Sequence, residues 1–524
     1  MRRSAVLLLA ALSIQPLAGQ PIEEEKFGEV IDVRVVNVEA VVTDRKGNRV
    51  TGLTPSDFRI RVDGVEVPID YFTEVVGGVV QPASGGEVPA LAEAGPLGRS
   101  YLVFIDESVV LARDRDLVLD ELEKDLDRLG PDDRMALVSF DGAQLHRLAD
   151  WTSNRRILSR AFTEARRRPA LGIRLNIERA YMPPDIGGED EMARALDDNT
   201  GMDRLGKLPR QDETELTILQ HAWLRRVAEA AAAAMRGFEL VPGRKSMLLL
   251  CGGWPLPELA DPLVQEANRL GYTLYPVDVP GMEAGPVVDI RQEKPAEQLT
   301  GVLSSDWELG VHASLGMVAE ATGGKPALNS ARVDALERAE QDTRSYYWLG
   351  FSPAWKADDR RHDIVVQVRR PGVEVRARSG FSDLSRAKIA EMDAESLLLF
   401  GPRPGSILGA LELELGQPRR VKRRILEVPV VVAFRPGALE PPPVKGRETE
   451  LVLTIAALDH NGERSDLPQM PLRFTLPEGA DESTEVRSQL TVQLRDMKQR
   501  LVFQLRDPVS GGSFVSEVSF KPGK

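Results

Sequence analysis

Ser100–Gly130 reads SYLVFIDESVVLARDRDLVLDELEKDLDRLG, and this stretch decides the fold expected for the middle of the chain. Its first seven residues are an apolar run typical of a strand buried on both faces, and apolar side chains then recur at helical spacing until Gly130. Similar apolar runs follow at RMALVSF, KSMLLLC, YTLYPVDV and YYWLGFSP, with helix-like segments between them. Because alternating strands and helices are typical of parallel sheets covered on both faces, the pattern predicts an α/β, doubly wound, mostly parallel sheet.

The sequence pattern changes on both sides of this region. Before it, VIDVRVVNVEAVVTD and FRIRVDGVEVPIDYF alternate apolar and polar residues and are broken by Gly-containing turns, which predicts an N-terminal β-module with tight hairpins. After Phe381, short apolar stretches such as RILEVPVVVAF and RLVFQLRD are separated by turn-rich text, which predicts an all-β, sandwich-like C-terminal domain.

These changes predict six consecutive parts. They are a signal peptide at 1–20, the N-terminal β-module at 28–76, a linker at 77–99, the doubly wound domain at 100–383 with an insertion at about 166–212, a helical connector at 384–403 and the C-terminal domain at 404–524. The insertion is charged and poor in apolar residues, so it is either a surface insertion or a mobile lid.

Met1–Gln20 reads MRRSAVLLLAALSIQPLAGQ, with two arginines, an apolar stretch and small residues before a cleavage point. This is the pattern of a secretory signal peptide, with an N-terminal anchor as the alternative. No later segment contains the run of about 18 apolar residues that a spanning helix needs. The sequence therefore predicts an exported chain, periplasmic or extracellular, with no transmembrane span after processing.

The composition excludes several classes of function. With 67 basic and 80 acidic residues among 524, the net charge is −13, which argues against a nucleic-acid binder. The single cysteine, Cys251, excludes a disulfide framework within the chain and a Cys-rich metal site. The five histidines are far apart in the sequence, so no zincin motif is present.

Several blocks together resemble a known family. YLVFIDES, RMALVSFDG, DWTSNRRIL, PGRKSMLLLCGG and GYTLYPVDV, preceded by VNVEAVVTDRKGNRVTGLTPSDFRIRVDGVEVPIDYF, are similar to von Willebrand factor type A (VWA) domain proteins, of the VWFA-related type typical of Acidobacteria. The matching blocks lie between about Val36 and Phe381. The resemblance implies a doubly wound domain that mediates adhesion or assembly and is not catalytic.

The resemblance also implies a metal-ion-dependent adhesion site. Asp106, Ser108 and Thr152 match three of its ligand positions, whereas Val110 and Gly252 stand where two further oxygen ligands are expected. Since Mg²⁺ requires near-octahedral oxygen coordination, this set predicts a degenerate site that holds Mg²⁺ weakly or not at all.

Other roles are open for the same residues. Glu107 and Asp141 follow neighbouring strands and are candidates to replace the missing ligands. Alternatively, Asp106 stabilises the turn after its strand, Ser108 caps a helix and Thr152 forms a hydroxyl-stabilised turn.

Two functions follow from the sequence. The first is an exported, non-catalytic module for protein binding, adhesion or assembly, with a protein partner at the cell envelope. The alternative is a metal-dependent or hydrolytic enzyme with its site at the strand ends and the 166–212 insertion, which would need a nucleophile and a base within hydrogen-bond reach.

Overall fold

The structure is a computed structural model. It describes residues 35–82, 95–172, 210–238, 243–254, 257–279, 297–401, 407–408, 411–439, 442–459, 465, 469–481, 483–508 and 512–522. The predicted signal peptide and most of the predicted 166–212 insertion lie outside these residues.

Among the described residues strands dominate, with 43% in strands against 29% in helices. They form five sheets, and four of these are mostly antiparallel. The prediction of a doubly wound, mostly parallel α/β fold is therefore wrong. The reason is that apolar runs reveal where strands lie but not which strands they pair with, and most strands outside one sheet have antiparallel neighbours.

One five-stranded sheet contains nearly all of the parallel pairing. Its order is β11-β10-β7-β8-β9, in which β9 alone is antiparallel to its neighbour. The bounds are β7 (Arg99–Asp106), β8 (Arg134–Phe140), β9 (Leu145–Thr152), β10 (Arg244–Cys251) and β11 (Tyr272–Asp278). We call this the central sheet.

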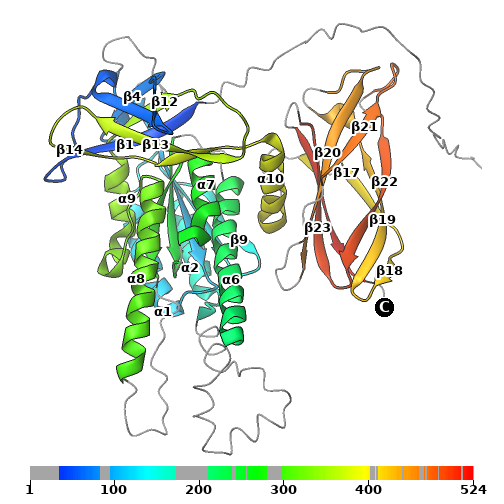
Figure 1. Cartoon of the computed structure of the whole chain (residues 1–524), viewed down its shortest axis with the longest axis horizontal. Helices are drawn as coiled ribbons and strands as arrows, with labels where there is room; N and C mark the ends of the chain where they lie inside the picture. The colour runs from blue at the N-terminus through cyan, green and yellow to red at the C-terminus, as the bar shows by residue number, and fades with distance from the viewer. Residues whose placement is uncertain are drawn as a thin grey trace, which may run out of the picture.

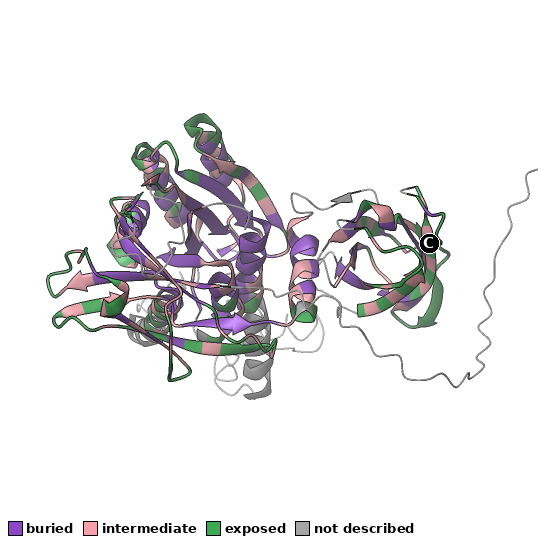
Figure 2. Cartoon of the chain, turned by 90° about the horizontal axis from the view of Figure 1, so that it is seen from above, coloured by how far each residue is buried: buried purple, intermediate pink, exposed green. Residues whose placement is uncertain are grey.

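Helices cover both faces of the central sheet (Figure 1). They are α1 (Ala112–Lys124), α2 (Arg155–Arg167) and α9 (Ala335–Thr343) on one face, and α6 (Arg210–Gly237), α7 (Asp261–Leu270) and α8 (Glu297–Ala321) on the other. Along β7, Leu102 and Phe104 pack with α6, α7 and α8, whereas Tyr101, Val103 and Ile105 pack with α1, α2 and α9. This follows from the two-residue alternation of strand side chains. Figure 2 shows the resulting concentration of buried residues in this layer.

The strands before and after these helices pair with each other. A six-stranded sheet has the order β14-β1-β12-β4-β5-β6, and a four-stranded sheet has the order β15-β13-β2-β3. The bounds are β1 (Val36–Asp44), β2 (Phe58–Val62), β3 (Val65–Val67), β4 (Tyr71–Val76), β5 (Val79–Val80), β6 (Gly95–Pro96), β12 (Tyr346–Phe351), β13 (Arg360–Val368), β14 (Val373–Arg376) and β15 (Gly380–Asp383).

The pairing of β12 differs from the sequence expectation. The sequence pattern predicts that the run YYWLGF belongs to the parallel sheet, but it lies antiparallel between β1 and β4. Its side chains Tyr347, Leu349 and Phe351 share one apolar core with Val38 and Phe58. The N-terminal strands therefore complete sheets whose other members come from residues about 300 positions later.

The C-terminal residues form two sheets around a shared apolar core (Figure 1). One has the order β16-β24-β23-β20-β21, and in the other β19 pairs with β17, β18 and β22. The bounds are β16 (Ile407–Leu408), β17 (Leu411–Leu415), β18 (Arg419–Lys422), β19 (Ile425–Phe434), β20 (Glu448–Asp459), β21 (Gln469–Thr475), β22 (Val486–Arg495), β23 (Gln499–Arg506) and β24 (Ser513–Phe520).

Helix α10 (Arg386–Phe400) joins the two halves of the described chain. On one side, Ser396 Oγ donates to the Ala233 carbonyl of α6 at 3.1 Å, and Leu399 belongs to the core beneath α6. On the other side, Leu397 and Leu398 pack against strands of the C-terminal sheets.

Short 3₁₀ turns complete the secondary structure: η1 (Pro55–Asp57), η2 (Asp125–Arg128), η3 (Pro257–Ala260), η4 (Asn329–Asp334) and η5 (Pro436–Ala438). None of the helices in the described ranges is long and apolar enough to cross a membrane.

Candidate functional site

Polar side chains collect where the parallel strands of the central sheet end. Asp106 ends β7, Cys251 ends β10, Asp278 ends β11, and Asp141 directly follows β8. The strands are parallel and in matching register, so their carboxyl ends meet at one edge. Open α/β sheets bind ligands at this edge, and we therefore call it the sheet-edge site.

Asp106 and Ser108 lie together at this site, and both are fully buried. The backbone N–H of Ser108 donates to Asp106 Oδ1 at 2.9 Å, and the Ser108 hydroxyl donates to the same oxygen. Asp106 Oδ2 has no hydrogen-bond partner among the described residues. Burial raises the pKa of Asp106 to about 7, against the opposing effect of the Ser108 bonds. The geometry matches the turn-stabilising role that the sequence left open.

Glu107 is fully buried beside them but is already paired. Arg168 Nε, just after α2, lies 2.7 Å from Glu107 Oε1 and 2.9 Å from Oε2. Burial still raises the pKa of Glu107 above its usual value, although the arginine opposes the shift. Because both carboxylate oxygens face Arg168, Glu107 does not act as a replacement metal ligand in this arrangement.

Asp141 is held in the turn between β8 and β9. Its Oδ1 accepts hydrogen bonds from the N–H groups of Ala143 and Gln144 at 2.9 and 2.8 Å, and its Oδ2 lies 2.7 Å from His146 Nε2. Burial opposes ionisation, but the bonds from His146 and from the backbone outweigh it and lower the pKa of Asp141 to about 2. Asp141 is therefore an ionised partner of His146.

Cys251 and Asp278 complete the edge on its other side. Cys251 is 1% exposed, and burial together with the nearby Asp106 charge raises the pKa of its thiol far above the usual value. Asp278 Oδ2 lies 3.1 Å from Nε2 of His312 on α8. Asp278 and His312 could not be recognised as site residues from the sequence, because 34 positions separate them and no motif connects them.

Thr152 lies at the opposite end of the central sheet. It pairs with Met135 near the start of β8, whereas Asp106 pairs with Phe140 at the end of β8, so the two positions are about 17 Å apart along the strand direction alone. The cause is the antiparallel direction of β9. Thr152 Oγ1 instead accepts a hydrogen bond from the Asn154 N–H at 3.0 Å, which is the turn role considered as an alternative.

The donor set at the sheet edge does not fit Mg²⁺. Val110 is fully buried in the apolar core, and a Cβ added at Gly252 would lie 3.3 Å from a methyl carbon of Val109. With Thr152 remote, Asp106 and Ser108 are the predicted ligands that remain, and the Ser108 hydroxyl already bonds to Asp106. Asp141 and Asp278 at the same edge are paired with His146 and His312. The two predicted ligands that remain are too few for an ion that needs near-ideal octahedral coordination.

The amino ends of the same strands are covered by buried ion pairs that no sequence motif predicts. Arg244, 2% exposed at the start of β10, has its Nε 2.7 Å from Oε2 of Glu39 in β1. Asp342, 3% exposed, pairs with Arg49 at 2.8 Å and also with Arg376 of β14. These pairs tie the central sheet to the six-stranded sheet.

Comparison with known proteins adds little to this geometry. No family model and no curated protein match the chain. A structural genomics target, SoR45, is 9% identical over 22% of this chain and 90% of its own, with a TM-score of 0.16. The pilus adhesin SpaC from Lactobacillus rhamnosus GG is 8% identical over 88% of this chain and 60% of its own, with a TM-score of 0.24. The β-glucosidase 3B from Thermotoga neapolitana, in complex with glucose, is 12% identical over 24% of this chain and 19% of its own, with a TM-score of 0.12. Similarities this weak do not establish a shared fold.

Proposed function

We propose that this chain is an exported, non-catalytic module that binds a protein partner at the cell envelope, in adhesion or assembly. The observation that supports this proposal is the burial of the sheet-edge nucleophiles: Ser108 is 0% exposed and Cys251 is 1% exposed. Export rests on the sequence of residues 1–20.

A hydrolytic site needs a nucleophile that a substrate can reach and a base that removes its proton. At this edge Ser108 and its hydrogen-bond partner Asp106 are both fully buried, where a substrate does not reach them. The pKa of Cys251 is raised, which disfavours the reactive thiolate. His146 and His312 lie beside Asp141 and Asp278. These contacts favour a structural role for the polar cluster at the sheet edge. A protein partner would then bind the outer surfaces of the chain.

The Asp141–His146 pair is the observation that favours the hydrolytic alternative. A histidine oriented by a carboxylate is two thirds of a catalytic triad, and the His146 side chain is 32% exposed. Purified chain that hydrolyses simple ester or peptide substrates, and loses this activity in His146→Gln, would favour the enzyme.

Site-specific photo-crosslinking in the organism of origin tests the binding proposal. A benzophenone amino acid is placed at one exposed position in each part of the described chain: Val65, Gln144 or Val444. We expect at least one position to yield a discrete adduct with an envelope protein. Excess purified wild-type chain should compete the adduct away, and the partner identified in it should bind the purified chain directly. If no position gives a competed adduct, the proposal is wrong.

A further inference from the structure

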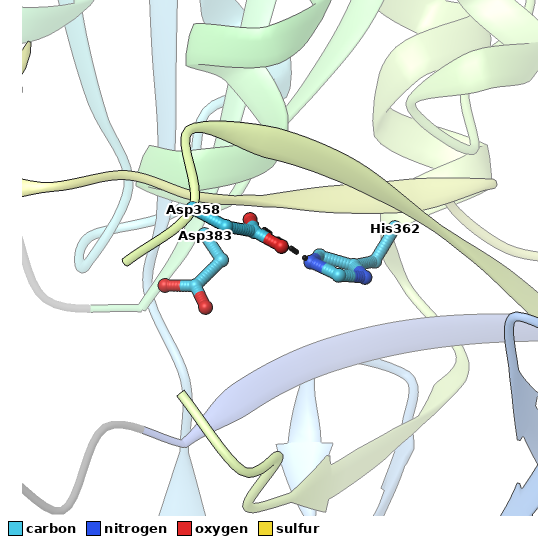
Figure 3. Close-up of side chains that lie close together, drawn as sticks. All are labelled: Asp358, His362 and Asp383. Carbon is cyan, nitrogen blue, oxygen red and sulfur yellow. Dashed lines mark ion pairs between the residues drawn. The ribbon is translucent and has the colours of Figure 1, made fainter. Parts of the chain in front are cut away.

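Three side chains of metal-ligating type meet beside the turn that precedes β13 (Figure 3). Asp358 lies in the turn, His362 on β13 and Asp383 at the end of β15. One ligand atom from each lies within 4.8 Å of the other two. His362 Nε2 is 3.5 Å from Asp358 Oδ1, close to the separation of about 3.4 Å expected between two ligands of a tetrahedral zinc ion.

Asp383 supplies an oxygen that lacks a partner. The residue is 2% exposed, and its Oδ2 accepts hydrogen bonds from the N–H groups of Lys356 and Ala357 at 2.5 and 3.0 Å. Its other oxygen, Oδ1, is buried and has no hydrogen-bond partner among the described residues. An unsatisfied buried polar atom is costly, and a bound cation would remove that cost.

His362 is held in the orientation of a ligand. Its Nδ1 lies 2.7 Å from Asp63 Oδ2, and its ring stacks on Phe381 with 5.1 Å between the ring centres. With Nδ1 as the donor to Asp63, the lone pair of Nε2 faces Asp358. A carboxylate that fixes the far nitrogen of a histidine is the usual arrangement behind metal-bound histidines.

A salt-bridge cluster is the competing explanation. The hydrogen bond to Asp63 raises the pKa of His362, so in the absence of a cation the protonated ring pairs with carboxylates on both sides. This arrangement leaves Asp383 Oδ1 unsatisfied, whereas a cation between the three side chains contacts all of them.

We propose that Asp358, His362 and Asp383 bind one divalent cation of the zinc class. Two carboxylates balance its charge, and the mixed nitrogen and oxygen donors suit Zn²⁺ better than Mg²⁺. Three protein ligands leave a further coordination position for water. The site is separate from the sheet-edge site and does not depend on the proposed protein-binding function.

The same turn also fixes the start of α10. Asp359 accepts hydrogen bonds from the Ser385 N–H at 2.6 Å and from the Ser385 hydroxyl at 2.9 Å. Ser385 in turn caps α10 by accepting from the Lys388 N–H at 3.2 Å. A cation on Asp358 and Asp383 therefore stiffens the segment that begins this helix.

The test is a zinc titration of the metal-free full chain, followed by calorimetry and by elemental analysis after gel filtration. We expect one equivalent of Zn²⁺ per wild-type chain. His362→Gln and Asp383→Asn should each bind at least tenfold more weakly, and Asp63→Asn about 10- to 100-fold more weakly, since it removes the group that orients the histidine. Co²⁺ in place of Zn²⁺ should give a visible absorption band that disappears in His362→Gln.

His146→Gln is the matched control, because it removes a histidine at the same 2.7 Å distance from a carboxylate but, among the described residues, outside any group of three metal-ligating side chains. It and Asp106→Asn should bind zinc like the wild type. Circular dichroism identifies variants that fail to fold, and His362, at the surface of the cluster, remains informative if Asp383→Asn does not fold. A wild type that binds no zinc, or His362→Gln binding as tightly as wild type, overturns the proposal.

Discussion

Asp106 is a carboxyl group that the fold keeps largely out of water. The N–H and the hydroxyl of Ser108 both donate to one of its oxygens, and Glu107 adds a further negative group beside it. Desolvation dominates, and it places the titration of Asp106 near neutral pH.

This shift has a consequence for the pH dependence of stability. The folded pKa of Asp106 is above the unfolded value, so between these values the folded chain binds more protons than the unfolded chain. The contribution of Asp106 to stability is complete below about pH 4 and is lost as the pH rises through about 7.

Asp106→Asn tests this consequence, because asparagine cannot ionise and keeps an oxygen for Ser108. From pH 5 to pH 8 the free energy of unfolding of the variant should rise relative to wild type by more than about 1.4 kcal/mol, the equivalent of one pKa unit. Urea unfolding of both proteins at the two pH values measures the difference. A difference that does not change with pH would contradict the assignment.

Some site residues could be placed from a sequence motif and others could not. Asp106 and Ser108 are two positions apart in the sequence, so their common location could be predicted from the motif. Thr152 could not be placed in the same way, because its position depends on the direction of β9, which no single residue encodes. His362 and Asp63 could not be connected at all, since 299 positions separate them.

At the scale of elements, two of the glycines in α8 and the turn after it have contrasting surroundings. Gly316 lies within α8, and a Cβ added there meets nothing within 4 Å. Gly324 follows the helix, and a Cβ added there would lie 1.8 Å from the Leu274 carbonyl oxygen of β11. The close approach of this turn to the central sheet requires the absence of a side chain.

Alanine at Gly316 and at Gly324 should therefore change the free energy of unfolding in opposite directions. Gly316→Ala should raise the free energy of unfolding by up to about 1 kcal/mol, because alanine loses less backbone freedom in a helix. Gly324→Ala should lower it by about 1–3 kcal/mol, the usual cost of overpacking, or more. Thermal unfolding of both variants measures this, and equal effects at the two sites would contradict the packing described.

Element positions were more predictable than element partners. The apolar runs of β7, β8, β10 and β11 identify buried strands directly, since both faces of each strand are covered. The run of β12 looks the same in the sequence but lies antiparallel in another sheet, because its partners β1 and β4 come from the start of the chain.

At the scale of the whole molecule, Asp342 connects three parts of the chain. It accepts a hydrogen bond from Tyr275 of β11 at 2.8 Å and pairs with Arg49 near β1 and Arg376 of β14. Burial opposes its ionisation, but the charges and bonds of its partners hold the pKa of Asp342 well below the usual range. It is therefore charged in the folded chain.

Asp342→Ala should lower the free energy of unfolding by about 1–3 kcal/mol, because it leaves the partly buried Arg49 and Arg376 without their shared counter-charge. Glu121→Ala is the matched control: it removes an exposed pair with Lys124 and should cost about 0–1 kcal/mol. Denaturant unfolding compares the two. Similar losses in both variants would show that Asp342 does not link the sheets as described.

The single cysteine gives the most direct test of whether the sheet-edge site is closed to substrates. Native chain and urea-unfolded chain are treated with iodoacetamide and with a serine-reactive fluorophosphonate, and the modified residues are identified by mass spectrometry. We expect Cys251 to react only after unfolding and Ser108 not to react in the native chain. Rapid modification of either residue in the native chain would mean that the site is open and reactive, and would contradict a non-catalytic role.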